Sequence, residues 1–261
     1  MSVSITGRRS ELGGLLAPHK ATGRVHFNVA GQQANTLLHD GHAWKEFART
    51  ARAATRRAMR TDASLLVHAS FAFVLGSPRE DPLRSLAETI LECENLILKG
   101  PVAACVVRLG YLYGPQSQDL RAYRTAFRRG RPYWAGPRRT GQFHLHHDDA
   151  VSALLAAAKP QNAGRTLYAV GGPPIPFMQF MDDFARRLGT RFPLHVPGIA
   201  EPLYKLVVAR EHMQQVALAM PARAPSPRVP GWKPTWPDYR LGLDQTTQAW
   251  SAELCSRASR S

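Results

Sequence analysis

The chain has few cysteines, few acidic residues and no long apolar run. Its three cysteines, Cys93, Cys105 and Cys255, have no paired spacing, which predicts a reduced protein without a disulfide framework. No apolar run reaches the roughly 18 residues of a membrane helix, and the N-terminus lacks the apolar core of a secretory signal. Together these absences predict a cytoplasmic protein that makes no contact with a membrane.

Acidic side chains are outnumbered, with 19 Asp and Glu against 34 Lys and Arg, so the formal net charge is +15. Such a field attracts anions, and a nucleotide or another anionic small molecule is a candidate ligand. A basic surface without a specific nucleic-acid partner is the favoured interpretation. The 261 residues and the apolar fraction of 44% predict one large globular domain, or a domain with a small lobe.

The most informative stretch runs from residue 65 to residue 115. An apolar strand, Leu65–Ser70, precedes a helical segment, Ser85–Leu98, and a second strand, Val102–Arg108, ends in a glycine turn. This order is typical of a parallel βαβ unit, in which ligands bind at the carboxyl ends of the strands. The flanking segments predict further strands and helices, so the fold class is α/β with a mostly parallel sheet.

Several short motifs follow one another at family-like spacing. They are Ser70–Gly76, Arg108–Pro115, Phe143–Asp149, Tyr168–Gly172 and Gly231–Pro234. In this order they resemble the extended short-chain dehydrogenase/reductase family, the NAD-dependent epimerase/dehydratases. The resemblance implies a Rossmann-like sheet over residues 1–170 and a small C-terminal substrate lobe over residues 171–261, with contributions from 116–140.

The same resemblance implies a cofactor, a substrate and a partner. The cofactor would be NAD(P), and its expected contacts are Gly7, Gly13, Ala30, Gly31 and Ser70. A nucleotide-sugar-like substrate would bind near Tyr111, Tyr113, Arg138 and His144. Members commonly form a homodimer through the helices that correspond here to residues 43–60 and 85–98.

The family's catalytic side chains are absent. Its chemistry uses a Ser or Thr, a Tyr and a Lys four residues later, and the Lys lowers the pKa of the phenol, which otherwise lies near 10. Alignment on the surrounding motifs places Phe71, Leu86 and Ile90 at these three positions. Apolar side chains cannot transfer a proton, so the family's hydride-and-proton mechanism is not expected here.

The N-terminal half of the cofactor domain is short. About twenty-four residues precede the strand Val25–Val29, too few for three βα units at roughly 30 residues per βαβ. Residues 5–13 are either a phosphate-binding fingerprint with Ser10 in place of its middle glycine, or the family's third strand and short helix. The short distance to Asn28 favours the second interpretation. In both cases Val3–Thr6 is predicted to pair in parallel with Val25–Val29, because the edge of that strand would otherwise be exposed.

A histidine cluster offers alternatives that the sequence leaves open. His144 and His146 would share one face of a strand, as two metal ligands do, but the family pattern explains the cluster structurally and no metal is expected. Three hypotheses for function remain. The favoured one is a non-catalytic or ligand-sensing relative. The others are a cofactor-independent isomerase or lyase that uses His144, His146, Asp148 or the tyrosines, and an NAD(P) enzyme with a remodelled or partner-supplied site.

Overall fold

The computed structural model describes residues 3–21, 23–30, 43–137, 140–190, 193–196 and 210–258. Its centre is a five-stranded sheet in which all neighbours are parallel, in the order β1-β2-β3-β4-β8. The strands are β1 (Ser4–Thr6), β2 (Val25–Asn28), β3 (Leu65–Phe71), β4 (Ala104–Leu109) and β8 (Thr166–Ala169). The predicted α/β class and the parallel sheet are therefore confirmed.

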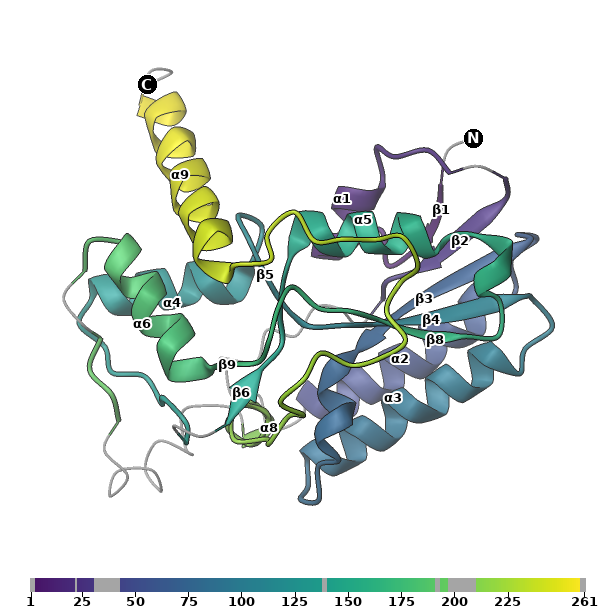
Figure 1. Cartoon of the computed structure of the whole chain (residues 1–261), viewed down its shortest axis with the longest axis horizontal. Coiled ribbons are helices and arrows are strands. Elements are labelled where there is room, and N and C mark those ends of the chain that lie inside the picture. Colours follow the sequence, from purple (N-terminus) through teal and green to yellow (C-terminus); the bar gives the residue numbers. More distant parts are fainter. Residues whose placement is uncertain are drawn as a thin grey trace.

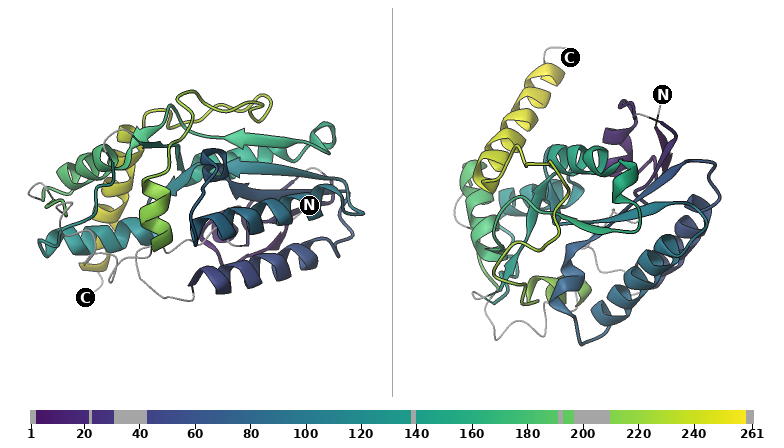
Figure 2. Two further views of the ribbon diagram at one scale, coloured as in Figure 1. Left: turned by 90° about the horizontal axis from the view of Figure 1, so that it is seen from below. Right: turned by 45° about the vertical axis from the view of Figure 1, so that its right-hand side comes forward.

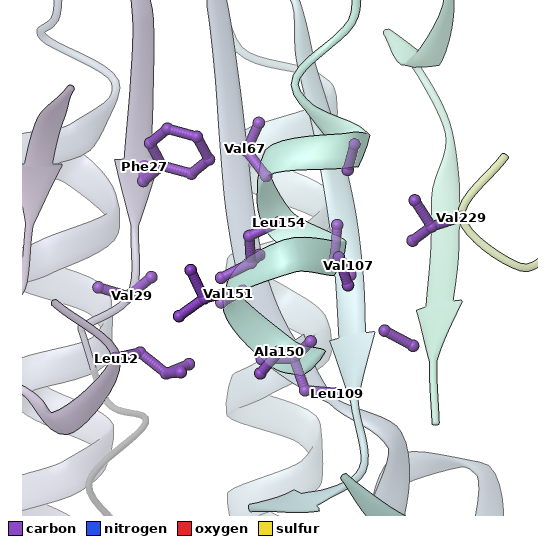
Figure 3. Packing of buried hydrophobic residues seen from close by; sticks show 14 of the residues in the cluster. Leu12, Phe27, Val29, Val67, Val107, Leu109, Ala150, Val151, Leu154 and Val229 are labelled. Carbon is purple, nitrogen blue, oxygen red and sulfur yellow. The ribbon is translucent and has the colours of Figure 1, made fainter. Parts of the chain in front are cut away.

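Two layers of helices cover the sheet (Figure 1). On one face lie α1 (Glu11–Leu16) and α5 (His147–Ala157), and on the other lie α2 (Ala43–Ala58) and α3 (Leu83–Leu98). Alternate strand residues point to each face because the side-chain period of a strand is two. Figure 3 shows α5 seated on the sheet, where Val151 and Leu154 meet Phe27, Val67 and Val107. This layer is the largest hydrophobic core of the described residues.

The N-terminal strand pairs as predicted. Ser4, Ile5 and Thr6 of β1 lie beside His26, Phe27 and Asn28 of β2 in parallel register. The strand thereby covers the edge of β2, whose four residues are all buried. An unpaired apolar edge at this position would be a template for aggregation, so even three residues of pairing protect it.

The connection from β1 to β2 has an unusual hand. It crosses the sheet in the same direction as β2–α2–β3, but α1 lies on the opposite face from α2 (Figure 1). Parallel crossovers are right-handed in about 98% of cases, and that rule would place α1 beside α2 and α3. The position of α1 on the same face as α5 is instead expected when β1 and α1 form the first βα unit of a sheet that continues with another strand on the far side of β1.

The other half of the molecule is built around a second core. It contains α4 (Gln118–Arg128), α6 (Phe177–Arg187), α8 (Arg210–Val216) and α9 (Tyr239–Ala258), together with β5 (Tyr111–Tyr113), β6 (Gly141–Gln142), β7 (His144–His146) and β9 (Ile175–Pro176). β5 pairs with β7, and β6 pairs with β9. Aromatic side chains of α4, α6 and α9 form this core, in which Trp250 is almost fully buried. The boundary of the lobe at residue 170 stays a prediction.

Two short 3-10 helices, Ala72–Gly76 and Pro160–Asn162, complete the described elements. Seen from below, α2 and α3 run side by side beneath the sheet (Figure 2). The last turns of α9 extend away from the body of the molecule (Figure 1). No helix among the described ranges combines the length and the apolar character that crossing a bilayer requires.

Candidate functional site

The three positions at which the family carries Ser, Tyr and Lys form one apolar cluster, here called the catalytic frame. Phe71 ends β3, and Leu86 and Ile90 lie on successive turns of α3. The ring of Phe71 lies 5.9 Å from that of Phe47 and 5.7 Å from that of Phe73, measured between centroids. Only about 10 Å³ of space remains beside Phe71 and Ile90, enough for about one water molecule.

A buried ion pair between Arg108 and Glu94 lies next to the catalytic frame. Arg108 of β4 donates from Nε and Nη2 to the two carboxylate oxygens of Glu94, at 2.9 and 2.6 Å. The hydroxyl of Ser70 donates to the same carboxylate at 2.5 Å, and Arg108 also donates to the Tyr168 hydroxyl at 2.9 Å. Ser70, expected to contact a cofactor, therefore has its hydroxyl committed to a bond within the fold.

A second polar group lies on the same face of the sheet, and sequence reasoning did not identify it. Both ring nitrogens of His26 lie 2.9 Å from hydroxyls of β1, those of Ser4 and Thr6. One strand along, Asn28 Nδ2 lies 3.0 Å from Nδ1 of His68. Burial lowers the pKa of His68 to about 4, so this histidine is neutral near pH 7. The sequence does carry a signal for this polar group, because polar residues alternate at positions 26 and 28 of β2 and at positions 68 and 70 of β3, which places them on one face of the sheet.

The turn after β1 has the geometry of a phosphate-binding fingerprint. Gly7 has a φ of +89°, a conformation that suits glycine, and its carbonyl accepts a hydrogen bond from the Ser10 amide. A Cβ on Gly13 would lie 2.1 Å from the Gly7 carbonyl oxygen, so the helix packs against the turn only because residue 13 is glycine. With the placement of α1, this geometry matches the fingerprint interpretation and not the third-strand interpretation that chain length favoured.

Ser10 changes what this turn offers to a phosphate. Its hydroxyl accepts a hydrogen bond from the Gly13 amide at 3.0 Å and donates to the Val29 carbonyl at 3.3 Å. A glycine at this position would let backbone approach a pyrophosphate, whereas the serine side chain fills the space. The carboxylate of Glu11, in the first turn of α1, accepts from the Gln118 amide at 3.0 Å and lies 3.0 Å from His147 Nε2. A negative charge at this place opposes a pyrophosphate.

Only some of the residues expected to bind NAD(P) are placed by the structure where they could contact a cofactor. Gly7 and Gly13 form the turn, and the Ala30 amide, at the end of β2, donates to Asn28 Oδ1 at 3.4 Å. Gly31 lies outside the described residues. The catalytic frame, where the family holds the nicotinamide ribose, is filled by Phe71 and Ile90. The described residues therefore fit a weakened phosphate turn but not a nicotinamide.

Of the residues expected around a substrate, two line a real cavity. Tyr113 at the end of β5 and His144 at the start of β7 line a cavity of about 250 Å³, which we call the lobe-side cavity. Its remaining walls include Gly172, Trp236, Tyr239 and Arg240. Tyr111 lies next to His144, but its hydroxyl donates to Asp119 at 3.3 Å. Arg138 lies outside the described residues.

Two residues that line the lobe-side cavity, Tyr113 and His144, have fully buried polar atoms that are poorly satisfied. His144 stacks on Phe180 with 4.0 Å between ring centroids and 14° between planes, and neither of its nitrogens has a well-formed hydrogen bond. Burial lowers the pKa of His144 to about 3, an effect that the Gln142 backbone opposes only in part. The hydroxyl of Tyr113 is also buried without a partner, and burial raises its pKa. Both groups are therefore neutral near pH 7.

Of the neighbouring histidines, His146 has hydrogen-bond partners, and His147 lies beside a carboxylate. Nε2 of His146 lies 3.2 Å from the side-chain oxygen of Gln245, and Nδ1 accepts from the Asp148 amide at 3.3 Å. His147 is fully buried beside Glu11. Among the residues that the structure describes, no group of three or more His, Cys, Asp or Glu side chains is placed to hold a metal ion.

Comparisons with known proteins agree with this fold. No protein-family profile matches the chain. Its fold is similar to that of the human epimerase family protein SDR39U1 solved with NADPH, at a TM-score of 0.70 and 14% identity, over 95% of this chain and 99% of that one. It is also similar to MoeE5 in complex with UDP-glucuronic acid and NAD, at a TM-score of 0.71 and 17% identity, over 97% and 99% of the two chains.

One curated relative is similar in sequence. It is a 3-diazoavenalumate denitrifying reductase from a Streptomyces species, 34% identical over 158 residues, or 59% of this chain. The match spans 50% of the length of that relative. The resemblance to the extended short-chain dehydrogenase/reductase family is therefore confirmed, as is the Rossmann-like fold.

Proposed function

We propose that this chain is a non-catalytic, ligand-binding relative of the NAD(P)-dependent epimerases and reductases. The observation that carries the proposal is the apolar packing of Phe71, Leu86 and Ile90 in the catalytic frame. Epimerases and dehydratases of this fold remove and return a proton beside the nicotinamide, which requires a titratable group at that place. Here the same volume is hydrophobic core, and about 10 Å³ is left beside it.

NAD(P) binding is expected to be weak. The structural neighbours were solved with NADPH or NAD, and the turn at Gly7 and Gly13 has the matching shape. Against this stand the side chain of Ser10, the carboxylate of Glu11 and the filled frame. Arg8 and Arg9 are exposed on the turn and are suited to attract an anion, so a nucleotide or another phosphorylated small molecule is the favoured ligand there.

A second candidate function is reduction by a nicotinamide cofactor without proton transfer, and the 34% identical reductase favours it. A hydride acceptor that is already strongly electrophilic needs no tyrosine to protonate it. In that case the catalytic frame would be dispensable, and the reaction would depend on cofactor binding alone. This candidate requires NADPH to bind tightly, which the proposed non-catalytic function does not.

Calorimetric titration with NADP(H) and NAD(H) separates the two. The wild-type chain is expected to bind either cofactor more weakly than micromolar, and Ser10→Gly, which restores the middle glycine, is expected to strengthen binding. Gly7→Ala is the matched variant expected to lose cofactor binding, because its Cβ would lie 2.5 Å from the Ala30 amide nitrogen. A micromolar or tighter constant for the wild type, abolished by Gly7→Ala, would overturn the non-catalytic proposal and favour the reductase.

We also propose a homodimer through α2 and α3. The alanines of α2 do not form its contact surface, because Ala51 and Ala58 are buried against the protein's own sheet. The outer surface instead carries Leu91 and Leu96, each 37% exposed, beside the ion pair of Arg52 and Glu92. Sedimentation analysis of the wild type and of Leu91→Glu tests this arrangement. A dimer that Leu91→Glu leaves intact would place the interface elsewhere.

A further inference from the structure

A second cavity, of about 430 Å³, lies between the loop that precedes α3 and the C-terminal end of α8, and we call it the α8 cavity. α8 lies beside the N-terminal end of α3 (Figure 1). One wall consists of residues 76–80 and Leu83, and the other of Gln214 and residues 217–219. The cavity includes no residue of the catalytic frame and none of those expected around a nucleotide-sugar-like substrate.

We propose that the α8 cavity binds a free α-amino acid with a large apolar side chain, whose carboxylate pairs with Arg79 and whose ammonium group pairs with Glu80. The proposal rests on the ligand-binding function proposed above and deepens it by naming a further site and the class of its ligand. It does not depend on NAD(P), because the phosphate turn at Gly7 is no part of this cavity.

The first argument is that contacts between the two walls hold the cavity open in the free chain. The side chain of Gln214 accepts a hydrogen bond from the Leu83 amide at 3.1 Å and donates to the Asp81 carbonyl at 2.9 Å. A Cβ on Gly76 would lie 2.4 Å from Cγ of Leu218, so Leu218 packs directly on the loop backbone because residue 76 is glycine. A site that is formed before its ligand arrives loses less conformational freedom on binding.

The backbone of the loop is unusual at Ser77. With a φ of +47°, Ser77 is the one non-glycine residue in the described part of the chain that has a positive φ. Side chains seldom adopt this conformation, and the residues that do so are concentrated at functional sites. Ser77 belongs to the wall of the α8 cavity, which supports a binding role for that wall.

The second argument is charge. Arg79 and Glu80 both line the cavity and are exposed, and within the described ranges neither side chain forms an ion pair or a hydrogen bond. The next charges along the chain are already paired, because Arg84 donates to Asp81 at 2.6 Å. A ligand with a carboxylate and an ammonium group can pair with both rim charges, whereas a simple anion at Arg79 would be repelled by Glu80.

The third argument is the apolar part of the lining. Pro78, Ala217 and Leu218 are partly exposed, and Ala219 is exposed. A volume of about 430 Å³ lies within the usual range of small-molecule sites and is large enough for an amino acid with a side chain such as that of leucine or phenylalanine. Burial of that side chain would supply affinity, and the two rim charges would orient the amino acid.

The test measures the binding of free L-phenylalanine and of three of its fragments to the full chain by ligand-observed NMR titration. The fragment 3-phenylpropanoate lacks the ammonium group, 2-phenylethylamine lacks the carboxylate, and glycine lacks the apolar side chain. The amino acid is expected to bind with a dissociation constant of about 1 mM or tighter. Each fragment should bind at least about threefold more weakly, which is the scale of a partly exposed ion pair.

Two variants assign the charges. Arg79→Gln removes the partner of the carboxylate, so it should bind the amino acid no more tightly than the wild type binds 2-phenylethylamine. Glu80→Gln removes the partner of the ammonium group and should lower the affinity to that of 3-phenylpropanoate. Lys99→Gln and Glu88→Gln are the matched controls, because each removes an exposed charge that does not line the cavity, and both should leave the affinity unchanged. Thermal unfolding of each variant establishes that it is folded.

Three results would each overturn the proposal. They are no binding of the amino acid below about 10 mM, equal binding of the amino acid and its singly charged fragments, and an affinity that Arg79→Gln and Glu80→Gln leave unchanged. Tight NADPH binding would overturn the non-catalytic function and leave these affinities unaffected. A failure of the amino acid to bind would in turn leave the apolar packing of the catalytic frame as it is, so the two proposals can fail separately.

Discussion

The catalytic frame and the lobe-side cavity depart from an ordinary active site in opposite ways. In the frame, apolar side chains occupy the positions of the catalytic residues, and only about 10 Å³ is left. The polar groups beneath it, on Ser70, Glu94 and Arg108, bond to one another. In the cavity, about 250 Å³ is open, and neither His144 nor Tyr113 has a well-formed side-chain hydrogen bond.

This difference separates a packed structural region from a candidate binding region. Filling a pocket and pairing every polar group increases stability, and the catalytic frame has the features of a structural core. An open volume lined by unpaired polar groups lowers stability, and such costs are typical of binding sites. The comparison therefore predicts that substitutions in the frame will destabilise the fold, whereas substitutions in the cavity will change binding at little cost.

The largest effect is expected from Glu94→Ala beneath the frame. It leaves the Arg108 guanidinium buried without its counter-charge, which costs about 3–5 kcal/mol of unfolding free energy. Glu92→Ala, two residues earlier on the same helix, removes only the exposed pair with Arg52 and should cost at most about 1 kcal/mol. Urea unfolding measures both. Equal losses would show that the buried ion pair is not a main support of the frame.

Ile90→Ala tests whether the frame is core. Ile90 is 4% exposed, so truncation should cost about 2–5 kcal/mol through lost burial and the cavity left behind. Leu254 on α9 is 50% exposed and lies outside the proposed dimer surface, so Leu254→Ala should stay within about 0.5 kcal/mol. If Ile90→Ala costs no more than Leu254→Ala, the space at the family's lysine position is not tightly packed, and the non-catalytic proposal weakens.

Acid should destabilise the fold through its buried histidines. Burial lowers the pKa values of His68 and His212 to about 4 and that of His144 to about 3. The unfolded chain binds protons to these rings below about pH 6.5 and the folded chain does not, so stability is full above that pH and falls as the pH drops toward 4. Burial also lowers the pKa values of His26 and His146. Each fully unprotonated histidine contributes a slope of about 1.4 kcal/mol per pH unit, and His144→Phe should remove the contribution of one of them. An unchanged slope in that variant would mean that His144 is protonated in the fold.

Much of the fold follows from the sequence, because strand and helix periodicity reports local burial. The central unit at 65–115, the pairing of β1 with β2 and the order of the motifs all rest on patterns of a few residues. The face chosen by α1 does not, since it depends on where the chain continues across the sheet. Chain length alone favoured the wrong interpretation of residues 5–13, whereas the contact of Gly13 with Gly7 decides it.

The candidate site was predicted only in part, because local patterns report some of its residues and long-range contacts bring in the others. Alignment identified the apolar residues of the frame, and the resemblance placed Tyr113 and His144 near a substrate. The remaining walls of the cavity come from Gly171, Gly172, Pro173 and Ile175 and from residues 236–240, and the last group lies more than ninety positions after His144, so no local pattern links it to the histidine. The burial of the His144 ring was equally invisible, because Phe180, which stacks on it, comes from a distant part of the chain.

The smallest and most discriminating effect on stability is expected from His144→Phe itself. The substitution removes two buried, unsatisfied nitrogens and keeps an aromatic ring against Phe180, so stability at pH 7 should stay equal or rise by about 1 kcal/mol. His146→Phe, two residues on, breaks the contacts with Gln245 and the Asp148 amide and should instead cost about 1–3 kcal/mol. Chemical unfolding of the two variants distinguishes a histidine without well-formed hydrogen bonds from one whose nitrogens support the fold. A clear loss in His144→Phe would mean that the nitrogens of His144 already stabilise the folded chain.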